Sequence, residues 1–419
     1  MDLRTRRNKT PMRILCLAAL AALPSCAPRE APPESPAEIP AELRLTRTSF
    51  SGLANWGAND PSGAFKAFAR SCDAIVSMPS DAPMSGAVYG GAAGDWLSVC
   101  GAAADVAAED PDATRAFFES EFVPYWVAEG ERDEGLFTGY FEPELRGSTV
   151  RQGEYQTPLY GVPSDLVSVD LGRFREQLSG QRIAGRVEDG RLVPYDTRAE
   201  IARDGLEQAE ELLYVDDPID AFFLQIQGSG RVQLEDGSVV RASYAGQNGH
   251  PYTAIGAVLI AREEMTREEV SMQSIREWLS ANPGQARELL DANASYVFFT
   301  IEPLADPELG ARGTQGVPLT AGASLAVDAS KHPLGVPVWV ETTAPVSDEG
   351  EAEFRRLLIA QDTGGAIRGA VRGDVYWGVG DGAGEIAGRM RGFGKMAVLV
   401  PLRVAQNIGE NFVHNPNAP

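Results

Sequence analysis

The chain has 419 residues, of which 43% are hydrophobic and 23% charged, and its formal net charge is −22. This length is enough for two or three domains with cores of their own. An acidic surface repels phosphate backbones, so nucleic acid is not expected as a partner. The 44 glycines and 28 prolines indicate many turns, and therefore a β-rich architecture rather than a helical bundle.

The N-terminus has the pattern of a secretory signal. Five basic residues among the first 13 precede an apolar run at residues 14–23, and no later stretch is apolar for long enough to span a membrane. The sequence Leu-Pro-Ser-Cys at residues 23–26 resembles the lipobox of bacterial lipoproteins. This resemblance implies that residues 1–25 are a signal peptide and that Cys26 is acylated. The alternative is an ordinary signal peptide with a cysteine nearby.

Residues 26–44 are predicted to be a lipid-anchored tether. The segment 27–42, APREAPPESPAEIPAE, is rich in proline, glutamate and alanine and has no core-forming pattern. In polyproline geometry it would reach roughly 50 Å. Such a tether would hold the folded part of the chain away from a membrane.

The remaining cysteines and the histidines limit the possible chemistry. In an oxidising compartment Cys72 and Cys100 are expected to form a disulfide, and two free buried thiols are the alternative. The histidines His250, His332 and His414 are single and far apart. No Cys/His cluster has metal-ligand spacing and no Gly-x-Ser-x-Gly elbow occurs, so neither a metal, another cofactor nor serine-hydrolase chemistry is expected.

Helix and strand signals alternate along the chain. Asp60-Pro61 and Asp110-Pro111 each predict a helix start, with an aspartate cap followed by a proline. Strand and turn signals then recur about every 8 to 12 residues between 156 and 246, which is typical of a β-barrel or sandwich. Residues 252–294 are predicted to be helical, and strands resume after them.

Two motifs in the middle of the chain carry polar side chains. The segment 136–143, LFTGYFEP, alternates like a strand and places Thr138, Tyr140 and Glu142 on one face. The segment 225–230, QIQGSG, is predicted to be a strand that ends in Gly-Ser-Gly. Amide side chains beside small residues suit a sugar, whose hydroxyls need hydrogen-bond partners at close range, although an ordinary hairpin turn is the alternative.

Two aspartates bracket a glycine-rich connection near the C-terminus. A buried strand at 356–361 is predicted to end at Asp362, and residues 363–365, Thr-Gly-Gly, require a turn. Asp374 then opens a further strand. The two carboxylates are candidates to face one cleft, and the alternative is two solvated turn aspartates. Asp328 ends another strand, and is expected either to support the site or only to cap a turn.

These motifs occur in an order that resembles the membrane-bound lytic murein transglycosylase A family. The resemblance covers about residues 56–401. It rests on the segments 137–143, 227–230 and 244–250 and on the C-terminal domain with its three aspartates.

The resemblance implies a fold that is mainly β with helices. A double-psi β-barrel domain would be formed by residues 45–148 and 301–410. A second, β-barrel-like domain, residues 149–300, would be inserted into it, and a groove between the two would hold a glycan strand.

The resemblance also implies a lytic transglycosylase. Such an enzyme cleaves the β-1,4 bond between N-acetylmuramic acid and N-acetylglucosamine in peptidoglycan and leaves a 1,6-anhydromuramyl end. Because the C6 hydroxyl of the sugar replaces water, one carboxyl group can donate a proton and then accept one, whereas most glycosidases need two carboxyls. Asp374 is implied to be that group, Asp362 is implied to raise its pKa, and Arg372 is expected to point away from it.

The remaining expectations follow from the same reading. His250 is expected to be a structural residue. A non-catalytic murein-binding lipoprotein and a hydrolase of glucan or chitin are the alternative functions. The implied partners are peptidoglycan glycan strands, a membrane through Cys26, and cell-wall synthesis or division proteins, at the periplasmic face of the outer membrane. The candidate substrate-binding residues are Thr138, Tyr140, Gln227, Gly228, Ser229, Tyr244, Asn248 and Asp328.

Overall fold

The computed structural model describes residues 42–84, 88–178, 181–347 and 350–414. The predicted signal peptide, Cys26 and all but the last three residues of the predicted tether lie outside these residues. Ala41–Pro419 form a compact unit by themselves. Among the described residues, no helix combines the length and the apolar character needed to cross a bilayer.

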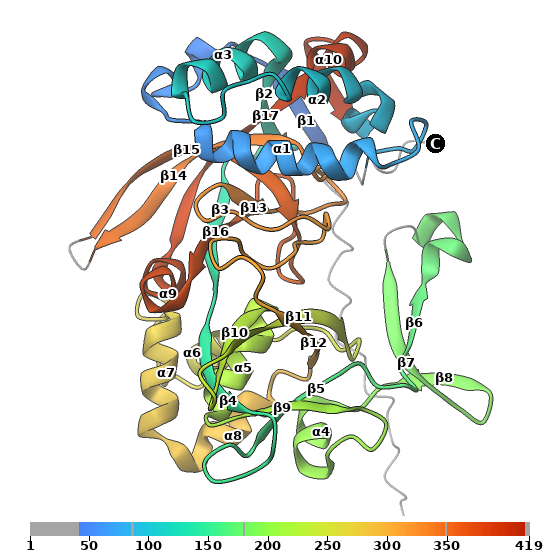
Figure 1. Ribbon diagram of the computed structural model, residues 1–419, viewed down its shortest axis with the longest axis vertical. Coiled ribbons are helices and arrows are strands. Elements are labelled where there is room, and N and C mark those ends of the chain that lie inside the picture. The colour runs from blue at the N-terminus through green and yellow to red at the C-terminus, as the bar shows by residue number, and fades with distance from the viewer. Residues whose placement is uncertain (1–41, 85–87, 179–180, 348–349, 415–419) are drawn as a thin grey trace, which may run out of the picture. The chain divides into compact units, whose positions relative to one another are not determined.

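Six strands close into a barrel, in the order β14-β15-β13-β16-β3-β17, and β14 pairs back onto β17 (Figure 1). This closed barrel in a mixed α and β chain confirms the predicted fold class. Further strands β2, β1 and β18 continue outward from β17. The bounds are β1 Leu43–Arg47, β2 Phe122–Glu129, β3 Gly135–Glu142, β13 Ser324–Ala326, β14 Pro337–Ser347, β15 Gly350–Asp362, β16 Gly373–Val379, β17 Arg391–Pro401 and β18 Asn411–His414.

The barrel and the N-terminal helices share one hydrophobic core. The core includes the run Leu357–Ala360 of β15, which is fully buried because it lies inside the barrel wall. Asp110 caps α3 by accepting hydrogen bonds from two backbone N–H groups, as its position before Pro111 predicted. A disulfide joins Cys72 of α1 to Cys100 of α2. The bounds are α1 Ser62–Val76, α2 Leu97–Ala103, α3 Pro111–Glu121, α9 Gly380–Arg389 and α10 Leu402–Ile408, with 3-10 turns at Phe50–Gly52, Trp56–Ala58, Val88–Gly90 and Ala93–Asp95.

A second sheet has six strands in the order β12-β11-β10-β4-β9-β5. The chain enters it at Pro143, because β4 already pairs with β10 and β9; the inserted domain therefore begins before the predicted residue 149. The helical prediction for residues 252–294 is confirmed by α6, α7 and α8. The bounds are β4 Glu144–Ser148, β5 Thr157–Tyr160, β9 Glu211–Val215, β10 Gly230–Leu234, β11 Val239–Gln247, β12 Val297–Pro303, α4 Arg198–Asp204, α5 Pro218–Gln227, α6 Ile255–Ala261, α7 Met272–Ala281 and α8 Pro283–Asp291.

The segment 225–230 is not the predicted strand. Residues Pro218–Gln227 form helix α5, which Asp217 caps by accepting from the N–H of Ile219. Gly228 ends the helix with φ +85°, a left-handed conformation that favours glycine, and β10 begins at Gly230. The prediction was wrong because a short apolar run fits a buried strand and a buried helix equally well.

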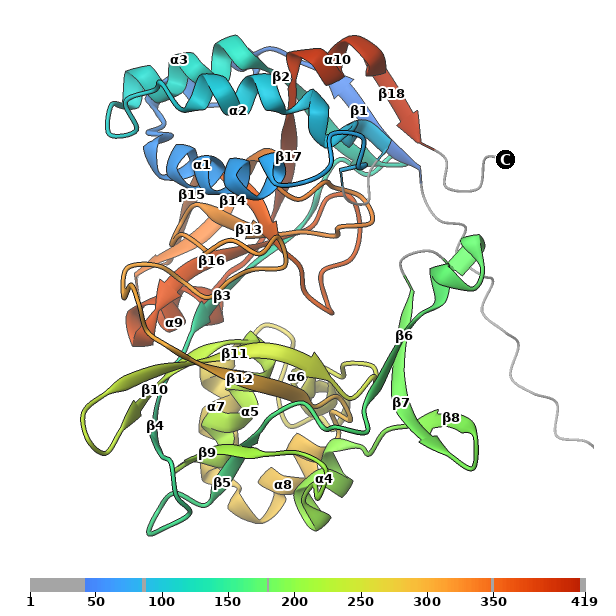
Figure 2. The same cartoon turned by 45° about the vertical axis from the view of Figure 1, so that its right-hand side comes forward.

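Three further strands form a sheet of their own within the inserted domain (Figure 2). They are β6 Val167–Asp170, β7 Arg182–Glu188 and β8 Arg191–Pro194, and β7 pairs antiparallel with both neighbours. Short 3-10 turns at Leu171–Arg173 and Glu176–Leu178 follow β6.

Candidate active site

The barrel brings Asp362 and Asp374 to the two sides of one short strand. Ala326 of β13 pairs with Asp362 on β15 and with Asp374 on β16. Because neighbouring strands lie about 4.8 Å apart, the backbones of the two aspartates are roughly 10 Å apart at one level of the barrel. The sequence separates these residues by a glycine-rich connection, and the strand order explains why they nevertheless lie close together.

One carboxyl oxygen of Asp374 accepts a hydrogen bond, and the other has no donor among the described residues. It lies in register with Thr138 of the parallel strand β3, and the Thr138 hydroxyl donates to Asp374 Oδ1 over 2.6 Å. The side chain is half-buried, and no described residue donates to Oδ2. Burial raises the pKa of Asp374 and the charge of Asp362 adds to the rise, whereas Arg372 and Thr138 act against it. A carboxyl with a raised pKa and a free oxygen is suited to donate a proton.

The expectation that Arg372 points away from the site is wrong. Its guanidinium donates to the Thr138 hydroxyl over 2.9 Å and to the Leu136 carbonyl over 3.1 Å, and it also bonds the Gly373 carbonyl. Strand β3 supplies the Thr138 and Leu136 acceptors and β16 supplies the Gly373 carbonyl, and a guanidinium with five donors lies across them. Thr138 therefore accepts from Arg372 while it donates to Asp374.

Asp362 differs from Asp374 because both of its oxygens are occupied. Oδ1 accepts from the backbone N–H and the hydroxyl of Thr314, over 2.9 and 3.0 Å, and Oδ2 accepts from the Tyr140 hydroxyl over 3.0 Å. Burial raises the pKa of Asp362, and these donors, with the backbone of Thr363, partly offset the rise. Donors to both oxygens favour the charged carboxylate.

Tyr140 is hydrogen-bonded to Asp362 and is influenced by the charges of both acids. Burial and the charges of Asp362 and Asp374 raise its pKa well above the ordinary value, so the hydroxyl stays protonated and donates. Its ring lies 5.3 Å from that of Tyr376, the residue in register with it on β16. The site therefore has an apolar aromatic wall beside its carboxyl groups.

Two side chains hold the connection between the acids, residues 363–372. Asp328 accepts from the N–H of Gly369 over 2.9 Å, and Gly369 has φ +108°. His332 bonds the Ala370 carbonyl over 2.6 Å through Nε2, and its Nδ1 lies 2.8 Å from the Tyr89 hydroxyl. Burial lowers the pKa of His332 to about 4, so the ring is neutral: Tyr89 donates to it and it donates to Ala370.

These contacts favour a positioning role for Asp328. Its other carboxyl oxygen accepts from the backbone and hydroxyl of Ser330, which leaves both oxygens in use. The sequence reading missed His332 and Tyr89, since they lie 243 positions apart and only the fold joins them.

The candidate substrate-binding residues in and near the second sheet lie in different environments. Gln227 accepts from the N–H of Phe141 over 3.1 Å and so ties the end of α5 to β3. Gly228 is the left-handed cap of α5, and Ser229 follows it. Tyr244 on β11 is 53% exposed, so its hydroxyl and ring are available to a ligand.

Asn248 and His250 make structural contacts within the second sheet. Asn248 is fully buried, and its amide donates to the carbonyls of Asp196 and Ala294 while its oxygen accepts from the N–H of Tyr296. His250 Nε2 lies 2.7 Å from the Tyr195 carbonyl, in agreement with the expected structural role. Contact between Asn248 and a substrate stays a prediction that these bonds do not favour.

A buried charge cluster joins the barrel strand β3 to the second sheet. Glu142 is fully buried and lies 3.4 Å from Arg231 Nε on β10 and 3.2 Å from Arg241 Nε on β11. The same arginines each donate over 2.6 Å, to the carbonyls of Pro307 and Leu309, in the segment that returns to the barrel. The cluster therefore holds the chain where it leaves the barrel and where it comes back.

Within the described ranges, no group of three or more His, Cys, Asp or Glu side chains is arranged to bind a metal ion.

Comparison with known proteins identifies relatives for both parts of the chain. Residues 136–300 match the family model of the MltA specific insert domain, and residues 323–400 match that of the 3D domain. Membrane-bound lytic murein transglycosylase A of Escherichia coli K12 is 37% identical over 253 residues, which cover 58% of this chain and 60% of the relative. The chain thus spans about 60% of the length of this curated relative.

Solved structures match over a larger share of the chain. The crystal structure of a membrane-bound lytic murein transglycosylase from Agrobacterium tumefaciens is 31% identical, with a TM-score of 0.76, and the match covers 87% of this chain and 99% of that one. Escherichia coli MltA with bound chitohexaose is 30% identical, with a TM-score of 0.59 and coverage of 80% and 89%.

Proposed function

Because the chain belongs to the membrane-bound lytic murein transglycosylase A family, we propose that it is a lytic transglycosylase of peptidoglycan. Its substrate is the glycan strand, and the bond cleaved is the β-1,4 bond between N-acetylmuramic acid and N-acetylglucosamine. A relative in this family is described with chitohexaose, a chain of the same kind of sugar linkage. The product is a 1,6-anhydromuramyl end.

In the first step Asp374 acts as the acid. Its free Oδ2 gives a proton to the glycosidic oxygen while Thr138 holds Oδ1, so the N-acetylglucosamine leaves as an alcohol. The raised pKa of Asp374, which comes mainly from burial, keeps a fraction of the group protonated. The carboxylate form of Asp362, which its hydrogen-bond donors favour, would support the positive charge that develops on the muramoyl ring.

In the second step Asp374 acts as the base. The C6 hydroxyl of the same muramoyl residue attacks C1, and Asp374 takes the hydroxyl proton. The acid is thereby restored and no water is consumed. One carboxyl suffices for both steps because the nucleophile belongs to the substrate, unlike in glycosidases, which use a second carboxyl.

The difference between the two acids carries this proposal. Both acids are half-buried, but Asp362 receives hydrogen bonds on both oxygens, whereas Asp374 keeps one oxygen free of the described residues. Only Asp374 can therefore both hold and hand over a proton without first breaking a bond to the protein.

Product analysis of digested sacculi by mass spectrometry tests the proposal. The wild-type chain is expected to release 1,6-anhydromuropeptides, and Asp374→Asn is expected to lower that rate by roughly 10²-fold or more while sacculus binding persists. Asp236→Asn, in the exposed turn between β10 and β11, is the matched control and is expected to keep the rate. Reducing muramyl ends would identify a hydrolase instead, and binding without release of any muropeptide would identify a murein-binding lipoprotein.

We also propose that acylation of Cys26 holds the chain at the periplasmic face of the outer membrane. The family name states membrane association, and the tether sequence after Cys26 suits a spacer between lipid and enzyme. Cell-wall synthesis or division proteins are candidate partners in this location.

A further inference from the structure

The three-stranded sheet β6-β7-β8 has one face made only of apolar residues. Val167 lies opposite Gly185, Val169 opposite Ile183, and Val187 opposite Leu192. Because side chains alternate across a strand and directly paired residues share a face, these residues and Pro194 all project from the same side. The other side carries Ser168, Asp170, Arg182, Ala184, Arg186, Glu188, Arg191 and Val193.

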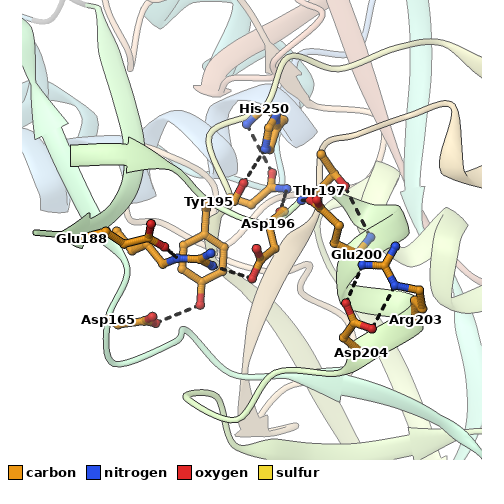
Figure 3. A network of polar contacts seen from close by, with 11 residues as sticks. Asp165, Glu188, Tyr195, Asp196, Thr197, Glu200, Arg203, Asp204 and His250 are labelled. Atoms are coloured by element: carbon orange, nitrogen blue, oxygen red, sulfur yellow. Dashed lines mark hydrogen bonds and ion pairs between the residues drawn. The ribbon is translucent and has the colours of Figure 1, made fainter. Parts of the chain in front are cut away.

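The polar face of this sheet is the one that meets the rest of the inserted domain. Arg186 pairs with Asp196 over 2.6 Å, and Tyr195, in the segment after β8, donates to Asp165 just before β6 (Figure 3). A Cβ at Gly249 would contact Ala184, so the loop after β11 packs against this side as well. The apolar face is therefore the side turned away from the second sheet.

The apolar face is open to solvent. Five of the fourteen large hydrophobic side chains that are exposed among the described residues lie between 167 and 192. Val187 is 59% exposed, and Phe174, in the turn after β6, is 75% exposed. Apolar side chains that gather on one exposed face, rather than lying scattered over the surface, are typical of a region that contacts another phase or molecule.

The charge of the same segment differs from that of the chain. Residues 167–194 hold five arginines and four acids, a net charge of +1, whereas the whole chain carries −22. Arg173 and Arg175 flank the exposed Phe174, and neither has an ion-pair partner among the described residues. An aromatic between free arginines, beside an aliphatic face, matches a lipid interface: apolar groups enter the acyl boundary and cations meet anionic headgroups.

We propose that the apolar face of β6-β7-β8 and the Phe174 turn bind an anionic phospholipid surface. This contact is additional to the expected acyl chain on Cys26 and would set the orientation of the enzyme on the membrane. The strands have four, seven and four residues, so the face measures at most about 23 by 14 Å, or roughly 300 Å². A stable dimer needs roughly 800 Å² from each partner, so a second copy fits this face poorly, whereas a membrane sets no such minimum.

Vesicle co-sedimentation of residues 41–419 tests the proposal without the anchor. This unit contains all four hydrophobic cores, and it lacks Cys26 and the signal sequence. It is expected to bind vesicles of phosphatidylethanolamine with phosphatidylglycerol, more weakly as salt rises, and to bind phosphatidylcholine vesicles least.

Three variants locate the contact. Val187→Asp is expected to lower the partition coefficient by roughly tenfold, and the double variant Arg173→Gln, Arg175→Gln by roughly fivefold for each arginine. Val413→Asp replaces a valine on β18 that is 50% exposed, and is expected to leave binding unchanged. Circular dichroism and muropeptide release check that each variant is folded.

The proposal is overturned if the wild-type unit does not bind anionic vesicles, or if Val413→Asp weakens binding as much as Val187→Asp does. It is also overturned if sedimentation velocity shows a dimer that Val187→Asp dissociates, since the face would then join two copies. If Val187→Asp lost sacculus binding but kept vesicle binding, the face would be assigned to the glycan instead.

Discussion

His332 is expected to make the stability of the protein depend on pH between about 6.5 and 4. The neutral ring is buried between Tyr89 and the Ala370 carbonyl, and its pKa is lowered from 6.5 to about 4. In the unfolded chain the ring takes up a proton near pH 6.5, whereas the folded chain does so only near pH 4. Protonation in this window therefore favours the unfolded state, and stability is lost as the pH falls.

The size of this effect follows from the two pKa values. At about 1.36 kcal/mol for each pKa unit, the lowering corresponds to on the order of 3 kcal/mol of unfolding free energy between pH 7 and pH 4. Urea denaturation of residues 41–419 across this range measures the loss. His332→Gln is expected to be less stable at pH 7, because the contact that holds residues 363–372 is weakened, but to lose less stability on acidification than the wild-type chain.

A matched substitution separates His332 from the other groups that titrate in the same range. His250→Gln changes a half-buried histidine of the second sheet and is expected to keep the pH dependence of the wild-type chain. Equal slopes for the wild-type chain and His332→Gln would refute the argument. A slope that His250→Gln alone removed would move its origin to the second sheet.

Three further substitutions test the site and its support. Thr138→Val removes a donor to Asp374 that lowers the pKa of this acid, so the pKa is expected to rise and the alkaline limb of the kcat–pH profile to move to higher pH. Glu142→Gln leaves two buried arginines without their anion and is expected to lower the unfolding free energy by about 3 to 5 kcal/mol in urea titrations. The double variant Cys72→Ser, Cys100→Ser removes a disulfide that spans 28 residues and is expected to lower the unfolding free energy by roughly 3 to 4 kcal/mol.

Each of these predictions has a control. Thr138→Ser keeps the hydroxyl. If the alkaline limb of the kcat–pH profile shifted as far in Thr138→Ser as in Thr138→Val, the hydrogen bond would not be the cause of the shift. Glu144→Gln changes an exposed acid two positions after Glu142, and an equal loss of stability there would contradict the role of burial. The wild-type protein in reductant is expected to have the same unfolding free energy as the double serine variant. A smaller loss of unfolding free energy in reductant would show that the serines destabilise the protein in some other way than by opening the disulfide.

Local signals in the sequence predicted much of the barrel domain. The Asp-Pro pairs marked the starts of α1 and α3, and the run predicted at 356–361 is buried in β15 except for the exposed Arg356. These features depend on neighbours within a few residues, which is why a linear pattern contains them. The same local pattern wrongly predicted a strand at 225–230, where α5 ends, because six residues are too few to distinguish the helical period from the strand period.

The motif order in the sequence was enough to single out Asp362 and Asp374 and to indicate the family. The resemblance assigned the two acids different roles, but it could not give their hydrogen bonds, which depend on partners from distant strands: Thr314 and Tyr140 for Asp362, and Thr138 for Asp374.

Other features were decided only by the tertiary structure. The inward turn of Arg372, the contact of His332 with Tyr89 and the pairing of Glu142 with two arginines all join residues from separate strands and loops. Their side chains are placed by the strand order of the closed barrel and by burial, because a buried charge or polar group persists only where the fold supplies its partner. The sequence determined which groups are present, and the fold determined which of them meet.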